Sequence, residues 1–246
     1  MSRKERIDKL LVTRGHTDSR SRAQALVMAG VVLVGERRVD KPSEMVAEDA
    51  AIRIKGDSPE ARYVGRGGLK LEKALAEFAI DPTGCACLDV GSSTGGFTDC
   101  LLQHGAATVV AVDAGTNQLV WSLRTDERVD VRENTNAREL TPADFTAPFD
   151  LIVMDVSFIS ATKILGVLVP LLSPSGKIIV LIKPQFEVGR GEVGKGGIVK
   201  EPEKHERVVR EVNGFAESCG LKVIGTIESP IHGAEGNKEF LSAYER

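Results

Sequence analysis

The 246-residue sequence has no apolar run long enough to cross a membrane. Its longest apolar stretch, residues 164–172, contains Gly166 and Pro170 and is far shorter than the roughly 20 residues that a membrane helix needs. The opening residues, MSRKERIDKL, are charged and lack the apolar core of a secretory signal. We therefore expect a protein that is not bound to a membrane and that works in the cytoplasm.

The sequence also has little of what metal sites and base-stacking surfaces require. Its four cysteines do not form the spaced pairs of a zinc site, and its four histidines have no metal-ligand spacing, so we expect reduced thiols and no bound metal. Only 4% of the residues are aromatic. Phe158 and Phe186 are the best candidates for stacking on a flipped base, and the alternative is that they only pack.

Charge is not distributed evenly along the chain. The formal net charge is −3, but residues 1–42 hold ten Lys or Arg against five Asp or Glu, so that segment carries +5 and the remainder −8. This asymmetry predicts a small nucleic-acid-binding module attached to an acidic main domain. A Gly, Pro and Ser-rich stretch from residue 56 to 68 is the natural connection between them.

The basic module shows two short helical patterns, around Ile7 and around Ala23, followed by a strand at residues 31–34 and another at 51–55. The segments Arg6-Ile7-Asp8, residues 19–23 and residues 29–35 resemble the RNA-binding domain named after ribosomal protein S4. The resemblance implies an RNA-binding domain over residues 1–60, with a linker at 61–68. The alternative is an ordinary solvated helix face. The expected RNA-binding residues are Arg6, Arg20, Arg22, Arg37, Arg38 and Lys41.

From residue 69 onward, apolar strand-like runs alternate with helical patterns. The expected strands are residues 86–90, 108–112, 129–131, 150–155, 178–182 and 221–227, with helices around 97–104, 117–124, 160–172 and 204–219. Such alternation predicts an α/β fold, a Rossmann-like parallel sheet with helices on both faces, spanning residues 69–246.

A glycine-rich turn, residues 91–96, directly follows the first of these strands. Glycines there let backbone amides approach a ligand, and Asp113, which ends the next strand, can accept both hydroxyl protons of a ribose. Alternatively, Asp113 caps a helix. This order of features resembles S-adenosylmethionine-dependent methyltransferases, which implies that cofactor. The expected cofactor-binding residues are Asp89, Gly91, Ser92, Ser93, Thr94, Gly95, Gly96, Phe97, Asp113, Asn136 and Asp155.

A second constellation consists of Lys70, Asp155, Lys183 and Glu239. Asp155 and Lys183 follow apolar strands, where an open sheet builds its crevice. The four residues resemble the catalytic tetrad of FtsJ-type RNA ribose methyltransferases. The motifs at residues 66–70, 155–160, 183–187 and 236–240 resemble the TlyA-type subfamily, historically called hemolysins. Taken singly, each lysine has the alternative of being a surface charge.

The resemblance implies an enzyme that methylates the 2'-hydroxyl of cytidine in ribosomal RNA of the small subunit, with the large subunit as a second candidate substrate. Lys183 would take or stabilise the hydroxyl proton, Asp155 would orient Lys183, and Lys70 and Glu239 would complete the hydrogen bonds. We expect a monomer whose partner is rRNA within ribosomal subunits. The alternatives are a non-catalytic ribosome-assembly factor, methylation of a base, and a cytolysin, which the family's historical name suggests.

Overall fold

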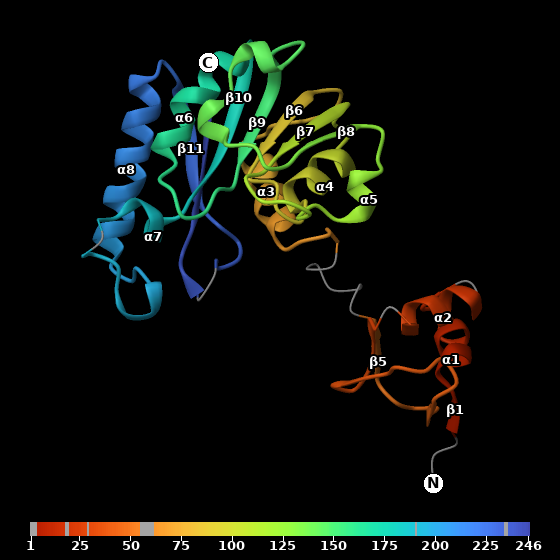
Figure 1. The fold of residues 1–246 in the computed structure, drawn as a ribbon. Helices are drawn as coiled ribbons and strands as arrows, with labels where there is room; N and C mark the ends of the chain where they lie inside the picture. The colour runs from red at the N-terminus through yellow and green to blue at the C-terminus, as the bar shows by residue number, and fades with distance from the viewer. Residues whose placement is uncertain (1–3, 18–19, 29, 55–61, 190, 234–235) are drawn as a thin grey trace. The chain divides into compact units, whose positions relative to one another are not determined.

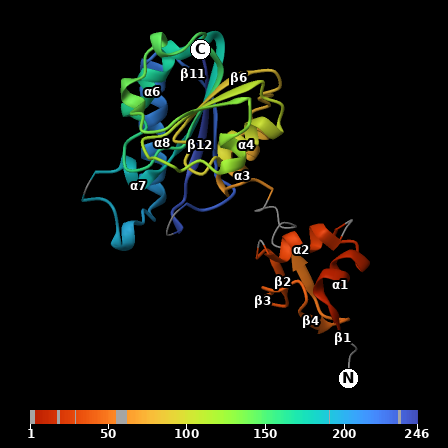
Figure 2. The same cartoon turned by 45° about the vertical axis from the view of Figure 1, so that its right-hand side comes forward.

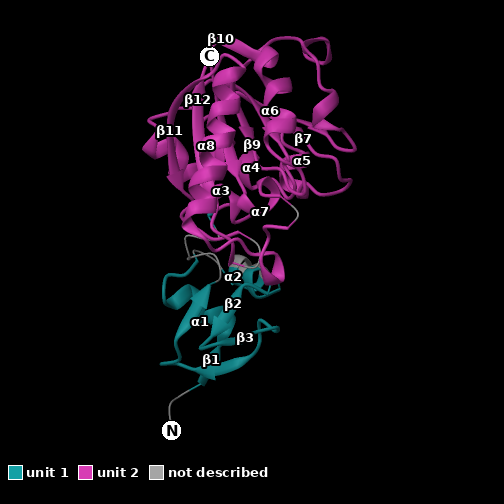
Figure 3. Cartoon of the chain, turned by 90° about the vertical axis from the view of Figure 1, so that its left-hand side faces the viewer, with its two compact units in different colours: residues 1–62 teal, residues 63–246 magenta. Residues whose placement is uncertain are grey.

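The computed structural model describes residues 4–17, 20–28, 30–54, 62–189, 191–233 and 236–246 (Figure 1). The chain divides into two compact units, residues 1–62 and residues 63–246 (Figure 3). The sequence places the start of the connecting stretch, and with it the domain boundary, near Gly56, which lies outside the described residues. Residues 63–68, which the sequence assigned to a linker, belong to the second unit.

The first unit packs two helices against short strands (Figure 2). Its apolar residues at helical spacing, among them Ile7, Leu11, Ala23 and Val27, are buried together with Val32 from a strand. One two-stranded and one three-stranded sheet complete the unit, in the orders β1-β4 and β3-β2-β5. The elements are β1 (Lys4–Arg6), α1 (Ile7–Thr13), α2 (Arg20–Met28), β2 (Val32–Val34), β3 (Arg37–Arg38), β4 (Met45–Ala47) and β5 (Ile52–Ile54).

The second unit is built on a seven-stranded sheet with the order β11-β12-β10-β9-β6-β7-β8. The pairs from β10 to β8 are parallel, and β12 is antiparallel to both of its neighbours. This arrangement confirms the predicted α/β fold, although the sequence did not predict β12. The strands are β6 (Ala86–Val90), β7 (Thr108–Val112), β8 (Val129–Arg132), β9 (Phe149–Met154), β10 (Leu172–Ile182), β11 (Lys222–Glu228) and β12 (Phe240–Glu245).

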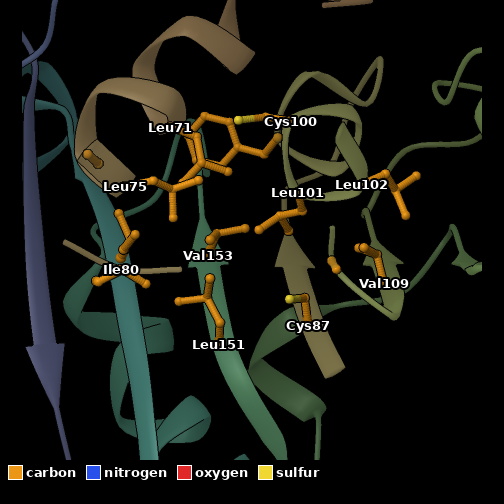
Figure 4. Packing of buried hydrophobic residues seen from close by; sticks show 14 of the residues in the cluster. Leu71, Leu75, Ile80, Cys87, Cys100, Leu101, Leu102, Val109, Leu151 and Val153 are labelled. Carbon is orange, nitrogen blue, oxygen red and sulfur yellow. The ribbon is translucent and has the colours of Figure 1, made fainter. Parts of the chain in front are cut away.

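Helices cover both faces of this sheet because successive strand residues point to opposite sides. Cys87, Leu151 and Val153 face α3 and α4, which contribute Leu71 and Cys100 to the same core (Figure 4). The intervening residues of the same strands pack on the other side against α6 and α8. The helices are α3 (Gly67–Glu77), α4 (Gly96–Gln103), α5 (Trp121–Arg124), α6 (Thr162–Leu168), α7 (Pro184–Glu187) and α8 (Pro202–Ser218).

Candidate active site

The glycine-rich turn after β6 lies between the ends of the two neighbouring strands. The backbone N–H groups of Gly91 and Ser92 both donate to the carbonyl of Val112, at the end of β7. Gly91 has φ +85°, and a Cβ atom there would lie 2.4 Å from the carbonyl oxygen of Asp155, just after β9. Only glycine satisfies both the backbone conformation and this close approach. The turn is therefore fixed at the carboxyl ends of three parallel strands.

Two cavities open beside this turn. The first, of about 290 Å³, is lined by Lys70, Asp155 and Lys183, and by the turn residues Gly91, Ser92, Ser93, Thr94, Gly96 and Phe97. The second, of about 760 Å³, is lined by Asp113 and Asn136 and by apolar side chains such as Val90 and Ile164. Four residues line both cavities, which are therefore adjacent: Gly91, Ser93, Asp155 and Ser157.

Asp113 holds the glycine turn in place. Its Oδ2 accepts the N–H of Ser93 at 2.8 Å, and its Oδ1 accepts the N–H of Gly115 at 2.7 Å. Asp113 does not cap the following helix, because α5 begins only at Trp121 with Val120 at its N-cap. Asp113 lines the second cavity.

The carboxylate that orders the segment before α5 is Glu133, which the sequence analysis did not single out. It accepts the backbone N–H groups of Asn117, Gln118 and Leu119 at 2.7, 2.8 and 3.1 Å. Arg124 forms an ion pair with Glu133 at 2.6 Å and is the main reason why the pKa of this carboxyl falls to about 2. Residues 117–120 are consequently an ordered loop rather than the predicted start of a helix.

Two residues of the expected cofactor set line neither cavity. Asp89 is fully buried within β6, where its Oδ2 accepts the hydroxyl of Thr98 from α4 at 2.7 Å. Burial disfavours the charged carboxylate and raises the pKa of Asp89 to about 7. Gly95 has φ +101° and lies against Leu119 and Leu123, so it contributes to the conformation and packing of the turn and does not line a cavity.

The tetrad forms two lysine–carboxylate pairs. Lys183, directly after β10, lies 2.6 Å from Oδ1 of Asp155 and donates to the hydroxyl of Ser157 at 2.8 Å. Lys70 on α3 donates to Oε2 of Glu239 at 2.5 Å. Burial of these charges is tolerated because each has an opposite charge as a partner.

Glu239 does not line the first cavity, whereas the other three members of the tetrad do. It acts on the cavity through its bond to Lys70. Its side chain is 2% exposed, against 10% for the side chain of Lys70. A Cβ atom on Gly233 would lie 1.9 Å from Oε1 of Glu239, so the segment before β12 must pass directly over this carboxylate. Glu239 thus holds the ammonium group of Lys70, and Lys70 itself lines the cavity.

Among the residues lining the first cavity that the sequence analysis did not assign to the site, three have polar side chains: Arg66, Ser157 and His232. Arg66 and Ser157 lie within the motifs that carry the family resemblance, and this was the signal available for them. His232 had been given no role because it lacks metal-ligand spacing. It reaches the cavity through the chain fold between β11 and β12, which no local pattern indicates.

The segment after β9 exposes an aromatic ring beside the second cavity. Phe158 is 91% exposed and has φ +65°, a conformation that is strained for a bulky residue. Its ring centroid lies 5.2 Å from that of Phe186 on α7. The neighbouring Glu187 fixes this segment by accepting the hydroxyl of Ser160 at 2.6 Å and the N–H of Ala161 at 2.7 Å. An exposed ring on an anchored segment is suited to stacking.

The expected RNA-binding residues of the first unit differ in how they are held. Arg6 and Arg20 both bond to the buried Asp8. The exposed Arg37 and Arg38 form ion pairs with Glu44 and Asp40, respectively. Lys41 is exposed, and the side chain of Arg22 lies outside the described residues.

The described residues contain no group of three or more His, Cys, Asp and Glu side chains arranged to hold a metal ion. No helix among them combines the length and the apolar character needed to span a membrane.

Comparison with known proteins identifies relatives of both units. Residues 63–246 match the FtsJ-like methyltransferase family and residues 5–52 match the S4 domain. The Bacillus subtilis (strain 168) protein YqxC, provisionally named an rRNA methyltransferase, is 51% identical over 98% of this chain and 85% of its own. The 16S/23S rRNA (cytidine-2'-O)-methyltransferase TlyA of Mycobacterium tuberculosis is 46% identical over 98% of this chain and 89% of its own.

A solved structure extends the match to the complete fold. A protein of Streptococcus thermophilus, provisionally named a hemolysin, superposes with a TM-score of 0.76 and 46% identity, over 100% of this chain and 90% of that chain. The chain is therefore a methyltransferase that belongs to the FtsJ-like family, as a TlyA-type member with an S4 domain.

Proposed function

We propose that the protein transfers a methyl group from S-adenosylmethionine to the 2'-hydroxyl of cytidine in ribosomal RNA. The observation that carries this proposal is the Lys183–Asp155 pair, which lines the same cavity as the glycine turn. The relatives from Mycobacterium tuberculosis and from Campylobacter jejuni are named as enzymes of this activity, the first on 16S and 23S rRNA and the second on 23S rRNA. Small-subunit rRNA is the proposed substrate, with large-subunit rRNA as a possible second one.

The second cavity has the size and chemistry for the nucleoside part of this cofactor. Its wall combines apolar side chains such as Val112 and Ile164 with the carboxylate of Asp113, and ligand pockets are typically apolar with a few polar groups. Asp113 can accept ribose hydroxyl protons, and Asn136 lies in the same wall. The glycine turn would hold the amino-acid part, since its backbone borders both cavities.

Bound S-adenosylmethionine supplies a methyl group on a positively charged sulfur, which is a ready leaving group. A ribose hydroxyl is a weak nucleophile at neutral pH and must lose its proton as its oxygen attacks. Lys183, held between Asp155 and Ser157, would act as the neutral amine, accept the proton of this hydroxyl as the oxygen attacks, and be stabilised by Asp155 as the resulting ammonium. Lys70, fixed by Glu239, would complete the hydrogen bonds around the oxygen.

The S4 unit would hold the structured RNA while Phe158 stacks on the target base beside the second cavity. Base–aromatic stacking contributes about 1–3 kcal/mol per base, which is enough to stabilise an extruded nucleotide. The protein would act as a monomer on ribosomal subunits, and this substrate would place it in the cytoplasm.

Mapping the methyl group tests the proposal. Purified 30S and 50S subunits lacking the modification are incubated with the protein and tritiated S-adenosylmethionine, and labelled sites are located by ribose-methylation-sensitive cleavage. We expect label on the ribose of a cytidine. Label on a base, or no incorporation into either subunit, would contradict the proposed reaction.

A further inference from the structure

One carboxylate in the S4 unit is completely buried at the point where three of its elements meet. Asp8 is the second residue of α1 and has 0% exposure. It follows β1, which contributes Arg6, and contacts Arg20 and Gln24 of α2. A buried charge persists only where donors satisfy it, so these contacts explain why aspartate is tolerated there.

The donors form a fixed arrangement around the carboxylate. Arg6 forms a two-bond fork, from Nε to Oδ1 at 3.0 Å and from Nη2 to Oδ2 at 2.9 Å. Arg20 donates from Nε to Oδ2 at 3.0 Å, and Gln24 donates from Nε2 to the same oxygen at 3.1 Å. The Arg6 guanidinium, more than any other neighbour, holds the pKa of the Asp8 carboxyl far below its usual range.

This arrangement places the guanidinium groups of Arg6 and Arg20 side by side and leaves terminal nitrogens of both groups available to bind a ligand. The side chains of Arg6 and Arg20 are 34% and 50% exposed, whereas the side chain of Asp8 is 0% exposed. Among the residues that the structure describes, Nη1 of Arg6 and both terminal nitrogens of Arg20 contact no acceptor. A single carboxylate therefore orients two guanidinium groups, and it leaves one net positive charge.

We propose that Asp8 is a positioning residue that holds Arg6 and Arg20 together as a binding site for a phosphodiester of RNA. Guanidinium groups with fixed orientation match the geometry of phosphate oxygens. Asp8 itself stays inside the unit and contacts no RNA. The inference rests on the proposed RNA binding by this unit, and it adds that binding depends on a buried negative charge.

The sign of one mutational effect separates positioning from simple electrostatics. Asp8→Asn removes a negative charge near the proposed RNA surface, so charge alone predicts tighter binding and a steeper salt dependence. Positioning predicts weaker binding, because asparagine replaces one of the two acceptor oxygens by an N–H donor and cannot keep the Arg6 fork together with the bond from Arg20. The two arginines must then be ordered when RNA binds. Ordering a long side chain on binding costs enough to weaken affinity severalfold, and we expect a loss of about fivefold to tenfold.

The experiment measures the affinity of the full-length protein for a fluorescein-labelled RNA hairpin by fluorescence anisotropy, at several salt concentrations. Glu36→Gln is the matched control. It also removes one negative charge from this unit, but Glu36 is 94% exposed and lies 3.7 Å from Arg53. We expect weaker binding for Asp8→Asn and equal or slightly tighter binding for Glu36→Gln. If Asp8→Asn binds as tightly as the wild type or more tightly, the positioning role is refuted.

The wild-type measurement distinguishes a failure of the proposed RNA binding from a failure of the positioning role of Asp8. If the wild-type protein does not bind the hairpin, the proposed RNA binding fails, and the inference fails with it. If the wild type binds but Asp8→Asn does not lose affinity, only the inference fails.

A charge-conserving pair of variants covers the case in which Asp8→Asn unfolds the unit, as judged by circular dichroism. Arg20→Lys keeps the charge of a half-exposed side chain but removes the guanidinium that bonds to Asp8. Arg53→Lys makes the same substitution at an arginine that Asp8 does not hold. The inference predicts a loss of affinity for Arg20→Lys alone, and equal affinities of the two variants would overturn it.

Discussion

The buried Asp89 makes a quantitative prediction about stability and pH. Its pKa rises from an ordinary value of 3.8 to about 7, chiefly because burial disfavours the charged form. Between these two values the folded protein keeps a proton that the unfolded chain has released. The free energy of unfolding then falls by about 1.4 kcal/mol per pH unit, or about 4 kcal/mol in total, between roughly pH 4 and 7.

Asp89→Asn removes this titration and leaves the strand in place. Its stability relative to the wild type should therefore rise with pH across that window and level off above pH 7. The amide adds a buried donor that costs about 1–3 kcal/mol, but this cost does not depend on pH. Urea unfolding of both proteins at half-unit pH intervals, without added cofactor, gives the difference directly.

Asp126→Asn is the matched control for that measurement. Arg128 lowers the pKa of Asp126 to about 2, so this carboxyl is ionised in both the folded and the unfolded chain above about pH 5. Its difference from the wild type should be constant between about pH 5 and 7. A constant difference for Asp89→Asn as well would refute the account of a protonated carboxyl beneath the glycine turn.

Three further predictions concern the site. Gly91→Ala should lower S-adenosylmethionine affinity in equilibrium dialysis by about 100-fold, because the new Cβ would meet the Asp155 carbonyl. The control Gly84→Ala, at a similar positive φ but in open space, should bind the cofactor normally. Equal losses of affinity in the two variants would contradict the close approach at Gly91. Phe158→Ala should lower methyl transfer about tenfold at saturating cofactor, and full activity would exclude stacking. Glu187→Ala should lower the free energy of unfolding by about 2 kcal/mol in urea unfolding, whereas Glu187→Gln, which can keep both hydrogen bonds, should lower it less. Equal losses of stability would contradict the role of Glu187 in fixing the segment at Ser160 and Ala161.

Much of the sheet was predictable from sequence because its central strands are buried on both faces. Residues 86–90 and 108–112 form strands with the predicted bounds, since continuous apolar runs of this length are typical of a parallel sheet. The strand Phe240–Glu245 was not predicted, although it inserts between β10 and β11. Its polar and small residues give a weak pattern, and its partners come from distant parts of the chain.

The site was predictable where residues follow strands, and less so where loops return to it. Asp155 and Lys183 directly follow β9 and β10, so the sheet itself places them at one edge. Glu133 orders the loop before α5 through hydrogen bonds to backbone groups 14 to 16 residues away, and His232 reaches the cavity from a loop. Such long-range contacts have no local periodicity, and sequence patterns cannot reveal them.

Replacement of Lys183 by methionine tests the central claim most directly. The variant keeps the length of the side chain but loses the ammonium that bonds to Asp155 and Ser157. Lys177→Met, in the middle of β10, is the control. With tritiated S-adenosylmethionine and ribosomal subunits, we predict that Lys183→Met loses about 10²- to 10⁴-fold in methyl transfer. Cofactor affinity should remain in both variants, and wild-type transfer by Lys183→Met would contradict the account.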